Sequence, residues 1–200
     1  MKRSPNNPFR RKRYRWTKAR ITICVRVLQV APRLGQRRAL YWAFRLIESG
    51  LDPLIIFRRL VAHASEDVGL ANSNALILAV SAMTAYEKLG PPEGFLALTH
   101  AIIGVCTSPK SNSVVVAMNE AMAAAEKKGE YYVPLHLRNT DFSTLDKAET
   151  PYVYPHDRGG YCKQQYLPDG LVGETFYRPS DHGDEKKIKD FLEYIRKNFY

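Results

Sequence analysis

The chain has 200 residues, of which 45% are hydrophobic and 25% are charged, and its formal net charge is +10. These fractions are ordinary for a globular protein, and no uninterrupted apolar run approaches the ~20 residues that cross a bilayer. The three Cys residues are odd in number and form no C-x-x-C pair, which favours neither a disulfide framework nor a zinc ribbon. Composition therefore predicts a cytoplasmic protein without a membrane partner.

The basic charge is concentrated at the N-terminus. The first 45 residues hold 14 of the 30 Lys and Arg residues and none of the 20 Asp and Glu residues. Residues 1–20 alone contain nine bases, and such a segment cannot build a core of its own. We therefore interpret residues 1–35 as a basic, flexible segment that meets a polyanion. An Arg-rich organelle-targeting peptide is the alternative, whereas the short apolar stretch at 21–30 does not indicate a secretory signal.

Aromatic residues lie among these bases, which is typical of segments that bind single-stranded nucleic acid. The bases neutralise phosphates and the rings stack on unpaired bases, with little sequence readout. A solvated tail without a partner fits the same composition. The candidate nucleic-acid-binding residues are Arg10, Arg11, Lys12, Arg13, Tyr14, Arg15, Trp16, Lys18 and Arg20.

Residues 36–130 have the apolar spacing of short helices separated by turn residues, which predicts a helical core. Asp52-Pro53 is an N-cap followed by proline at the first helical position. Asn72 or Ser73 caps a later helix. The residues expected to face inward are Ala75, Leu76, Ala79, Val80, Met83 and Tyr86. The helices are expected at about 35–50, 52–69, 73–90, 92–106 and 108–129.

The helix at 92–106 is apolar nearly all round, so we expect it to be central. The following helix is expected to begin at Ser108-Pro109 and to bury Val115, Met118, Met122 and Ala125.

Residues 131–200 are rich in Pro, Tyr and Gly, which indicates an irregular segment that packs on the core. A final helix is expected at about 184–198. The predicted fold class is all-α: a bundle of about five short helices, an irregular segment and a C-terminal helix.

The stretch 104–111, GVCTSPKS, is one residue away from the phosphate-loop pattern G-x-x-x-x-G-K-[ST]. A phosphate loop wraps phosphates with backbone N–H groups between a strand and a helix. Here Gly104 is expected inside a helix, and Pro109 takes the second Gly position without an N–H. We interpret the stretch as a joint between two helices.

Two further groups resemble functional clusters. Glu66 and Asp67 offer paired carboxylates for acid–base chemistry, but adjacent helical residues point about 100° apart. Capping, or ion pairs with Arg58, Arg59 or a neighbouring subunit, is the favoured interpretation. A tail metal site from His156, Asp157, Cys162, His182 and Asp184 is the second alternative, although nothing in the spacing demands it. No catalytic, cofactor or metal residue is predicted.

Three phrases carry a specific resemblance: ALYWAFRLIESGLDPLIIFRRLVAHASEDVGLAN, KLGPPEGFLALTHAIIGVCTSPKSNSV and YVPLHLRN. They resemble the C-terminal region of the replication-associated recombination protein A family of AAA+ ATPases, also called MgsA, whose eukaryotic relative is the Werner helicase-interacting protein. The resemblance covers about 38–139 closely and resumes in the C-terminal segment.

The resemblance implies an all-helical domain that forms a homotetramer, in proteins that act at stalled replication forks and contact DNA ends and single-stranded-DNA-binding protein. The residues that match the family pattern are expected to serve fold and assembly. They are Tyr41, Trp42, Arg45, Asp52, Pro53, Arg58, Arg59, Ser65, Glu66, Asp67, Gly69, Pro109, Lys110, Ser111, Pro134, His136, Leu137, Arg138 and Asn139.

The phosphate loop and magnesium motif of the family's ATPase module have no counterpart in these 200 residues. ATP and Mg²⁺ would belong to that module, so we expect no ATP hydrolysis by this chain alone. The sequence predicts a non-catalytic oligomerisation domain of a replication and repair ATPase. The alternative is a nucleic-acid-binding module that works through its basic N-terminal segment.

Overall fold

The structure is a computed structural model, and it describes residues 35–127, 132–138 and 152–199. Within these ranges it contains six α-helices and several short helical turns and no β-strand, which confirms the all-α prediction. The chain divides into two units, Met1–Asn112 and Ser113–Tyr200. None of the helices in the described ranges is both long enough and apolar enough to cross a membrane.

The first unit begins with two helices joined by a short turn. Helix α2 spans Gly35–Glu48 and helix α3 spans Pro53–His63. Gly50 has a φ of 93°, a conformation that residues with a Cβ rarely adopt. The Asp52 carboxylate then accepts a 2.9 Å hydrogen bond from the Leu54 amide, and Pro53 is the first helical residue. This confirms the predicted cap, because both contacts lie within the first turn.

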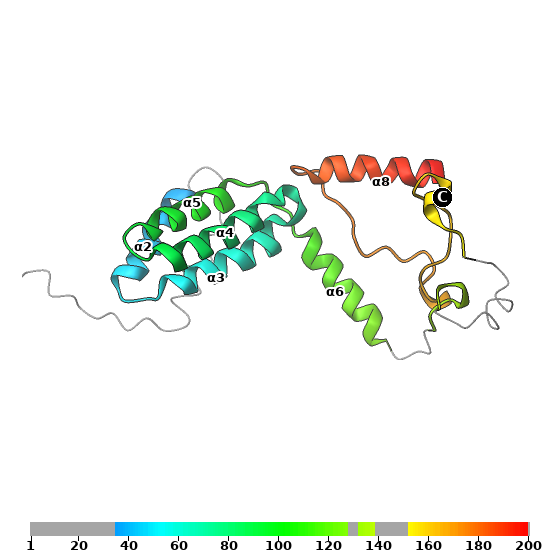
Figure 1. The fold of residues 1–200 in the computed structure, drawn as a ribbon, viewed down its shortest axis with the longest axis horizontal. Helices are drawn as coiled ribbons and strands as arrows, with labels where there is room; N and C mark the ends of the chain where they lie inside the picture. The colour runs from blue at the N-terminus through cyan, green and yellow to red at the C-terminus, as the bar shows by residue number, and fades with distance from the viewer. Residues whose placement is uncertain (1–34, 128–131, 139–151, 200) are drawn as a thin grey trace, which may run out of the picture. The chain divides into compact units, whose positions relative to one another are not determined.

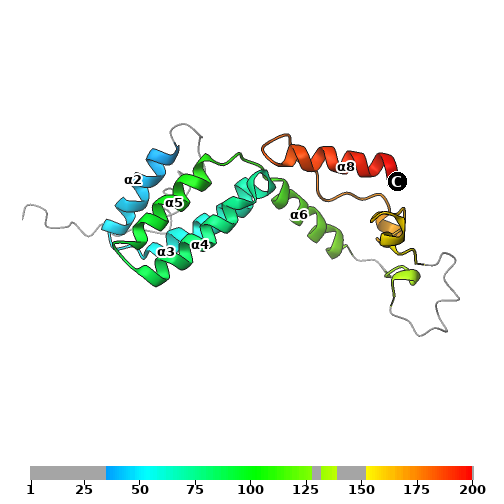
Figure 2. The same cartoon turned by 45° about the horizontal axis from the view of Figure 1, so that its top comes forward.

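Helices α4 (Asn74–Leu89) and α5 (Gly94–Thr107) complete the first unit. Figures 1 and 2 show α2, α3, α4 and α5 side by side, and α5 contacts each of the other three. The predicted central place of α5 follows from its buried side chains, Leu98, Ala101, Ile102 and Val105.

Aromatic rings extend the core from α2 to α3. Phe44 packs edge-on against Phe95, with ring centroids 5.7 Å apart, and Phe95 stacks on Tyr86 at 6.1 Å. Tyr86 in turn contacts the fully buried Phe57 at 5.3 Å. Such ring pairs stabilise beyond the area they bury, so this row fixes the α2 side of the unit.

Helices α4 and α5 approach closely at two glycines. A Cβ on Gly104 would lie 2.2 Å from Cδ2 of Leu78. A Cβ on Gly94 would lie 2.7 Å from a Tyr86 ring carbon and 3.2 Å from the Tyr86 Cα. Gly104 therefore sits inside a helix, as predicted, and serves helix packing there.

The second unit contains α6 (Ser113–Glu126), three short turns and α8 (Glu185–Phe199). The turns are η3 (Leu135–Leu137), η4 (Pro155–Arg158) and η5 (Asp169–Leu171). The final helix is thus observed where it was predicted. The sequence places the α6 residues in the helical core at 36–130, whereas in the structure they belong to the second unit.

One carboxylate organises this second unit. Glu185 is fully buried at the start of α8 and accepts hydrogen bonds from the Ser113 hydroxyl, the Tyr177 hydroxyl at 3.1 Å and Ser180. Ser180 contributes both its amide, at 2.9 Å, and its hydroxyl, at 2.5 Å. The start of α6, the segment 177–180 and the start of α8 are therefore joined at one side chain. No spacing in the sequence predicts these contacts.

Two predictions about apolar faces are wrong. Leu76 and Val80 were expected inward but are 38% and 42% exposed, because the smaller Ala75, Ala79 and Ala82 face the core of the unit.

The helix expected from Ser108-Pro109 instead begins at Ser113. Residue 108 is extended, as residues before proline tend to be. Met118 and Met122, expected inward, are each 53% exposed, and Ala124 is the buried alanine of this helix in place of Ala125.

Candidate functional site

The family-pattern residues 63–69 form a π-helical turn, η1 (Ala64–Val68), at the end of α3. A π turn often marks a functional position in a helix. The buried His63 lies with Nδ1 2.8 Å from an Asp67 carboxylate oxygen and 4.0 Å from one of Glu66. Gly69 ends the turn with a φ of 52°.

The two carboxylates therefore share a partner that the sequence analysis missed. Arg58 and Arg59, the predicted ion-pair partners, are exposed on α3, and no ion pair with either carboxylate is seen in the described ranges. The i, i+4 spacing of His63 and Asp67 was the available signal.

The segment after α5 lies against this turn. The Ser111 amide donates a 2.8 Å hydrogen bond to the Asp67 carbonyl, and the Asn72 side chain donates one of 2.9 Å to the Ser108 hydroxyl. That hydroxyl donates to the Gly104 carbonyl at 2.7 Å. Residues 108–112 thus form tertiary hydrogen bonds in place of a helical turn, which is why α6 does not begin at Pro109.

Lys110 closes the C-terminal end of α5. Its Nζ donates a 2.5 Å hydrogen bond to the Val105 carbonyl, a favourable place for a cation at a helix C-terminus. Burial lowers the pKa of Lys110, while the nearby Cys106 and Asp67 oppose that change. Burial likewise raises the pKa of the Cys106 thiol, and Lys110 lowers it in part. In this joint Lys110 supports the helix end and does not reach toward a phosphate site.

Two groups could hold a metal ion. His63, Glu66 and Asp67 place their ligand atoms within 4.8 Å of one another. The tail alternative is not brought together: in the described ranges His156, Asp157, Cys162, His182 and Asp184 do not form such a group. The donor set of the first group suits Zn²⁺ or Mn²⁺. The His63–Asp67 hydrogen bond accounts for the same geometry.

The remaining family-pattern residues are spread over both units. Tyr41 is 61% exposed on α2 and meets Trp42 edge-on. His136 Nε2 lies 2.9 Å from the Gln165 carbonyl oxygen. Arg138 donates to the Val133 carbonyl at 2.7 Å. Asn139 and the basic residues 10–20 lie outside the described residues, so their predicted roles stay predictions.

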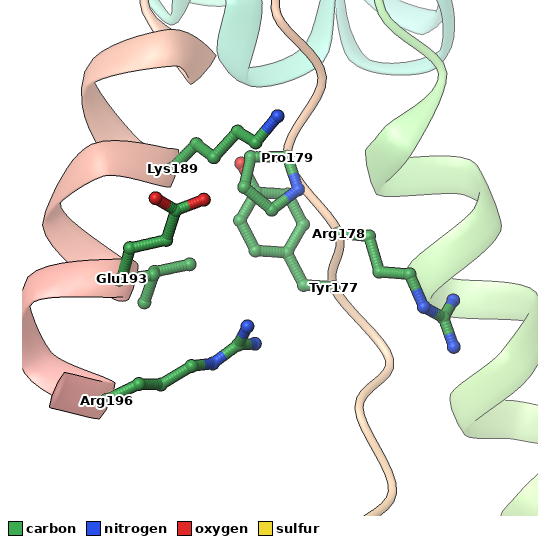
Figure 3. Close-up of a pocket in the computed structure, with 7 residues that line it drawn as sticks. Tyr177, Arg178, Pro179, Lys189, Glu193 and Arg196 are labelled. Carbon is green, nitrogen blue, oxygen red and sulfur yellow. The ribbon is translucent and has the colours of Figure 1, made fainter. Parts of the chain in front are cut away.

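The second unit has a small pocket of about 160 Å³ beside α8. Figure 3 shows Lys189, Glu193 and Arg196 on the helix, with Tyr177 and Pro179 facing them.

Cations border this pocket, but two of them are already paired. Arg178 points away from α8 and pairs with Glu120 at 2.7 Å. Lys189 pairs with Asp181 at 2.8 Å, which lowers the pKa of Asp181 and raises that of Lys189. The pocket is therefore a weak candidate for an anion site.

The outer sides of α4 and α5 combine large apolar residues with a few polar ones. The exposed polar residues between Leu76 and Thr107 in these helices are Ser81, Thr84, Glu87, Lys88, His100 and Thr107. Helix α5 contains no Asp, Glu, Lys or Arg, and α4 contains none before Glu87. A helix that is apolar all round is normally buried on all sides. We call the exposed part the α4/α5 apolar surface, which consists of Leu76 (38% exposed), Ile77 (62%), Val80 (42%), Leu96 (76%) and Ile103 (39%).

Comparison with known proteins shows a match to the family described as "MgsA AAA+ ATPase C terminal" over residues 36–196. The chain is 42% identical over 164 residues to Replication-associated recombination protein A of Coxiella burnetii, covering 80% of this chain and 37% of that protein. It is 37% identical over 161 residues to the Escherichia coli K12 protein of the same name, covering 78% and 36%. It is also 36% identical over 141 residues to "ATPase WRNIP1" of Dictyostelium discoideum, covering 68% and 16%.

Proposed function

Because the chain belongs to the MgsA-type C-terminal family of AAA+ ATPases, we propose that it is the non-catalytic oligomerisation domain of a replication and repair ATPase, and that it assembles as a homotetramer. The chain spans a little over a third of the length of the bacterial relatives it matches.

The observation that carries the proposal is the α4/α5 apolar surface. Surface helices normally place charged residues on the solvent side. Here Ile77, Leu96 and Ile103 take that side, and no charged residue lies among them on either helix. Large exposed apolar surfaces rimmed by polar residues are typical of protein interfaces.

A second copy of the chain is the occupant that fits this surface. An isologous interface sets the same surface against itself, and a surface without charge presents no like-charge repulsion when it does so. The first charged residues of α4, Glu87 and Lys88, have opposite signs and lie at the end of the surface. We infer that they belong to the polar rim.

In this proposal the catalytic part of the ATPase is a separate module that is not formed by these 200 residues. ATP and Mg²⁺ bind to the ATPase module, and DNA and single-stranded-DNA-binding protein are partners of the assembled protein. Around η1 the Lys110 side chain donates to the Val105 carbonyl, and the Ser111 backbone amide donates to the Asp67 carbonyl. This use of the family-pattern residues supports a role in the fold.

The test is the molar mass in solution, measured by light scattering during size-exclusion chromatography. We expect the chain at micromolar concentration to elute well above its monomer mass of 22.8 kDa, with a tetramer as the limit. One isologous interface closes a dimer, so a tetramer uses a second contact as well. Ile77→Glu and Leu96→Glu should therefore lower the mass to a dimer or below, because each would bury an unpaired charge in the α4/α5 interface.

Val172→Glu is the matched control, because Val172 is 60% exposed in the second unit and should leave the mass unchanged. A wild-type chain that elutes as a monomer at that concentration contradicts the proposal.

A second candidate function is nucleic-acid binding through residues 10–20. The composition of this segment favours it, since nine bases and no acid lie within residues 1–20. Deletion of residues 1–20 should weaken binding to single-stranded DNA and flatten its dependence on salt. Unchanged binding after the deletion contradicts this role.

A further inference from the structure

The exposed face of α2 combines positive charge with an aromatic ring. Arg37, Arg38, Tyr41 and Arg45 are all exposed, and their spacing places them within about 100° of one another around the helix axis. No ion pair or hydrogen bond of the three Arg side chains is seen in the described ranges. This face belongs to the described structure and is distinct from residues 10–20.

An apolar groove lies beside this ring. Its volume is about 350 Å³, and it is lined by Leu40, Tyr41, Phe44, Arg45 and Glu48. The groove is shallow and open to solvent, so a ligand would lie on it and would not be enclosed.

The floor of the groove is held in place by the core. Phe44 packs on Phe95, which continues the row of aromatic contacts to Phe57. Trp42 and Tyr41 form a T-shaped pair, with ring centroids 5.2 Å apart and an interplanar angle of 75°, and Tyr41 remains 61% exposed. The groove and its ring are therefore preorganised, which lowers the entropic cost of binding a flat ligand.

The charged residues on the exposed face of α2 indicate which kind of flat ligand the groove binds. Arg45 and Glu48 are the charged residues that line the groove. The exposed Arg37 and Arg38 lie one turn before Tyr41 on the same helix. Alternation of Arg with an exposed aromatic ring is the arrangement that binds a single strand, since phosphates meet the cations and an unstacked base meets the ring. A duplex keeps its bases stacked and cannot use the ring.

We propose that the outer face of α2 is a contact site for single-stranded nucleic acid, in which Tyr41 stacks on a base at the groove and Arg37, Arg38 and Arg45 contact the flanking phosphates. The site deepens the second candidate function but does not depend on residues 10–20. It is also independent of the α4/α5 apolar surface, because it uses a different helix.

The experiment measures the fluorescence anisotropy of a labelled oligo(dT) strand with the full chain. Tyr41→Ala should weaken binding about 5- to 100-fold, whereas Tyr41→Phe should bind within about twofold of wild type, because the ring provides the stacking. The double variant Arg37→Ala/Arg45→Ala should flatten the slope of log K against log salt by roughly 0.7 for each lost phosphate contact.

The matched control is Arg58→Ala/Arg59→Ala, which removes the same charge from the exposed side of α3. Its effect on affinity should be clearly smaller than that of the α2 pair. Equal weakening by the two pairs overturns the proposal, because it would show attraction by net charge alone. Wild-type affinity of Tyr41→Ala also overturns it.

Competition and mass measurements separate the remaining interpretations. Unlabelled single strands should displace the probe better than a duplex, an oligoglutamate peptide or phosphatidylserine vesicles, and equal displacement by any of these overturns the proposal. All α2 variants should keep the molar mass of the wild type. Loss of binding together with loss of the assembly would assign the effect to oligomerisation and so overturn the α2 site.

Discussion

Replacement of Glu185 should destabilise the second unit selectively. Its fully buried carboxylate accepts four hydrogen bonds, from the Ser113 hydroxyl, the Tyr177 hydroxyl and the amide and hydroxyl of Ser180. Glu185→Ala removes the common acceptor and leaves these donors without it. A buried donor deprived of its acceptor costs about 1–3 kcal/mol, and Glu185 is the shared acceptor of several donors.

We therefore expect Glu185→Ala to destabilise the second unit by about 3–5 kcal/mol. That is a large part of the 5–15 kcal/mol of a typical domain, so the unit should open far more often than in wild type. Glu185→Gln keeps the volume and one acceptor oxygen, and we expect a cost of about 1–3 kcal/mol. Glu185→Ala should therefore lower the free energy of unfolding more than Glu185→Gln does.

Native-state hydrogen exchange measures the effect element by element. Amides of α8 should lose protection in Glu185→Ala, while those of α5 in the first unit should keep theirs. Glu193→Ala is the control, because Glu193 is exposed on the same helix. A change below about 0.5 kcal/mol for Glu185→Ala, the range of ordinary surface substitutions, would refute the role of the network.

Three further predictions concern single residues. Gly94→Ala should lower the urea midpoint of unfolding, because the added Cβ would press on the backbone of Tyr86 as well as on its ring. Gly104→Ala should be nearly neutral, because the added Cβ meets the end of the flexible Leu78 side chain and the helix gains about 1 kcal/mol of propensity. Iodoacetamide should modify Cys162 well before the buried Cys106, whose thiol pKa is raised, and mass spectrometry of peptides would show equal rates only in urea. Burial and the neighbouring Glu185 raise the pKa of Tyr177 to about 12. The folded state therefore keeps a proton that the unfolded chain releases near pH 10, so the free energy of unfolding should fall between pH 10 and 12 in wild type. The fall should be smaller in Tyr177→Phe.

Local features of the fold were predictable because their causes lie within a few residues. Asp52 caps the helix two residues ahead, and the helical placement of Gly104 follows from the apolar run around it. His63 and Asp67 could also have been paired from their i, i+4 spacing.

Long-range contacts were not predictable from spacing. Asn72 and Ser108 are 36 residues apart, and Ser113 and Glu185 are 72 apart. The apolar pattern also fails at Leu76, because period alone does not tell a buried apolar face from an exposed one.

The family-pattern phrases HASEDVG and SPKSN look like two motifs in the sequence, but they are one joint in the structure. The Ser111 amide reaches the Asp67 carbonyl, and the Asn72 side chain reaches Ser108. These two hydrogen bonds hold the segment after α5 against η1 and the residues that follow it. A motif rich in Ser, Asp and Lys is therefore compatible with a structural role, because its polar groups join segments of the same unit.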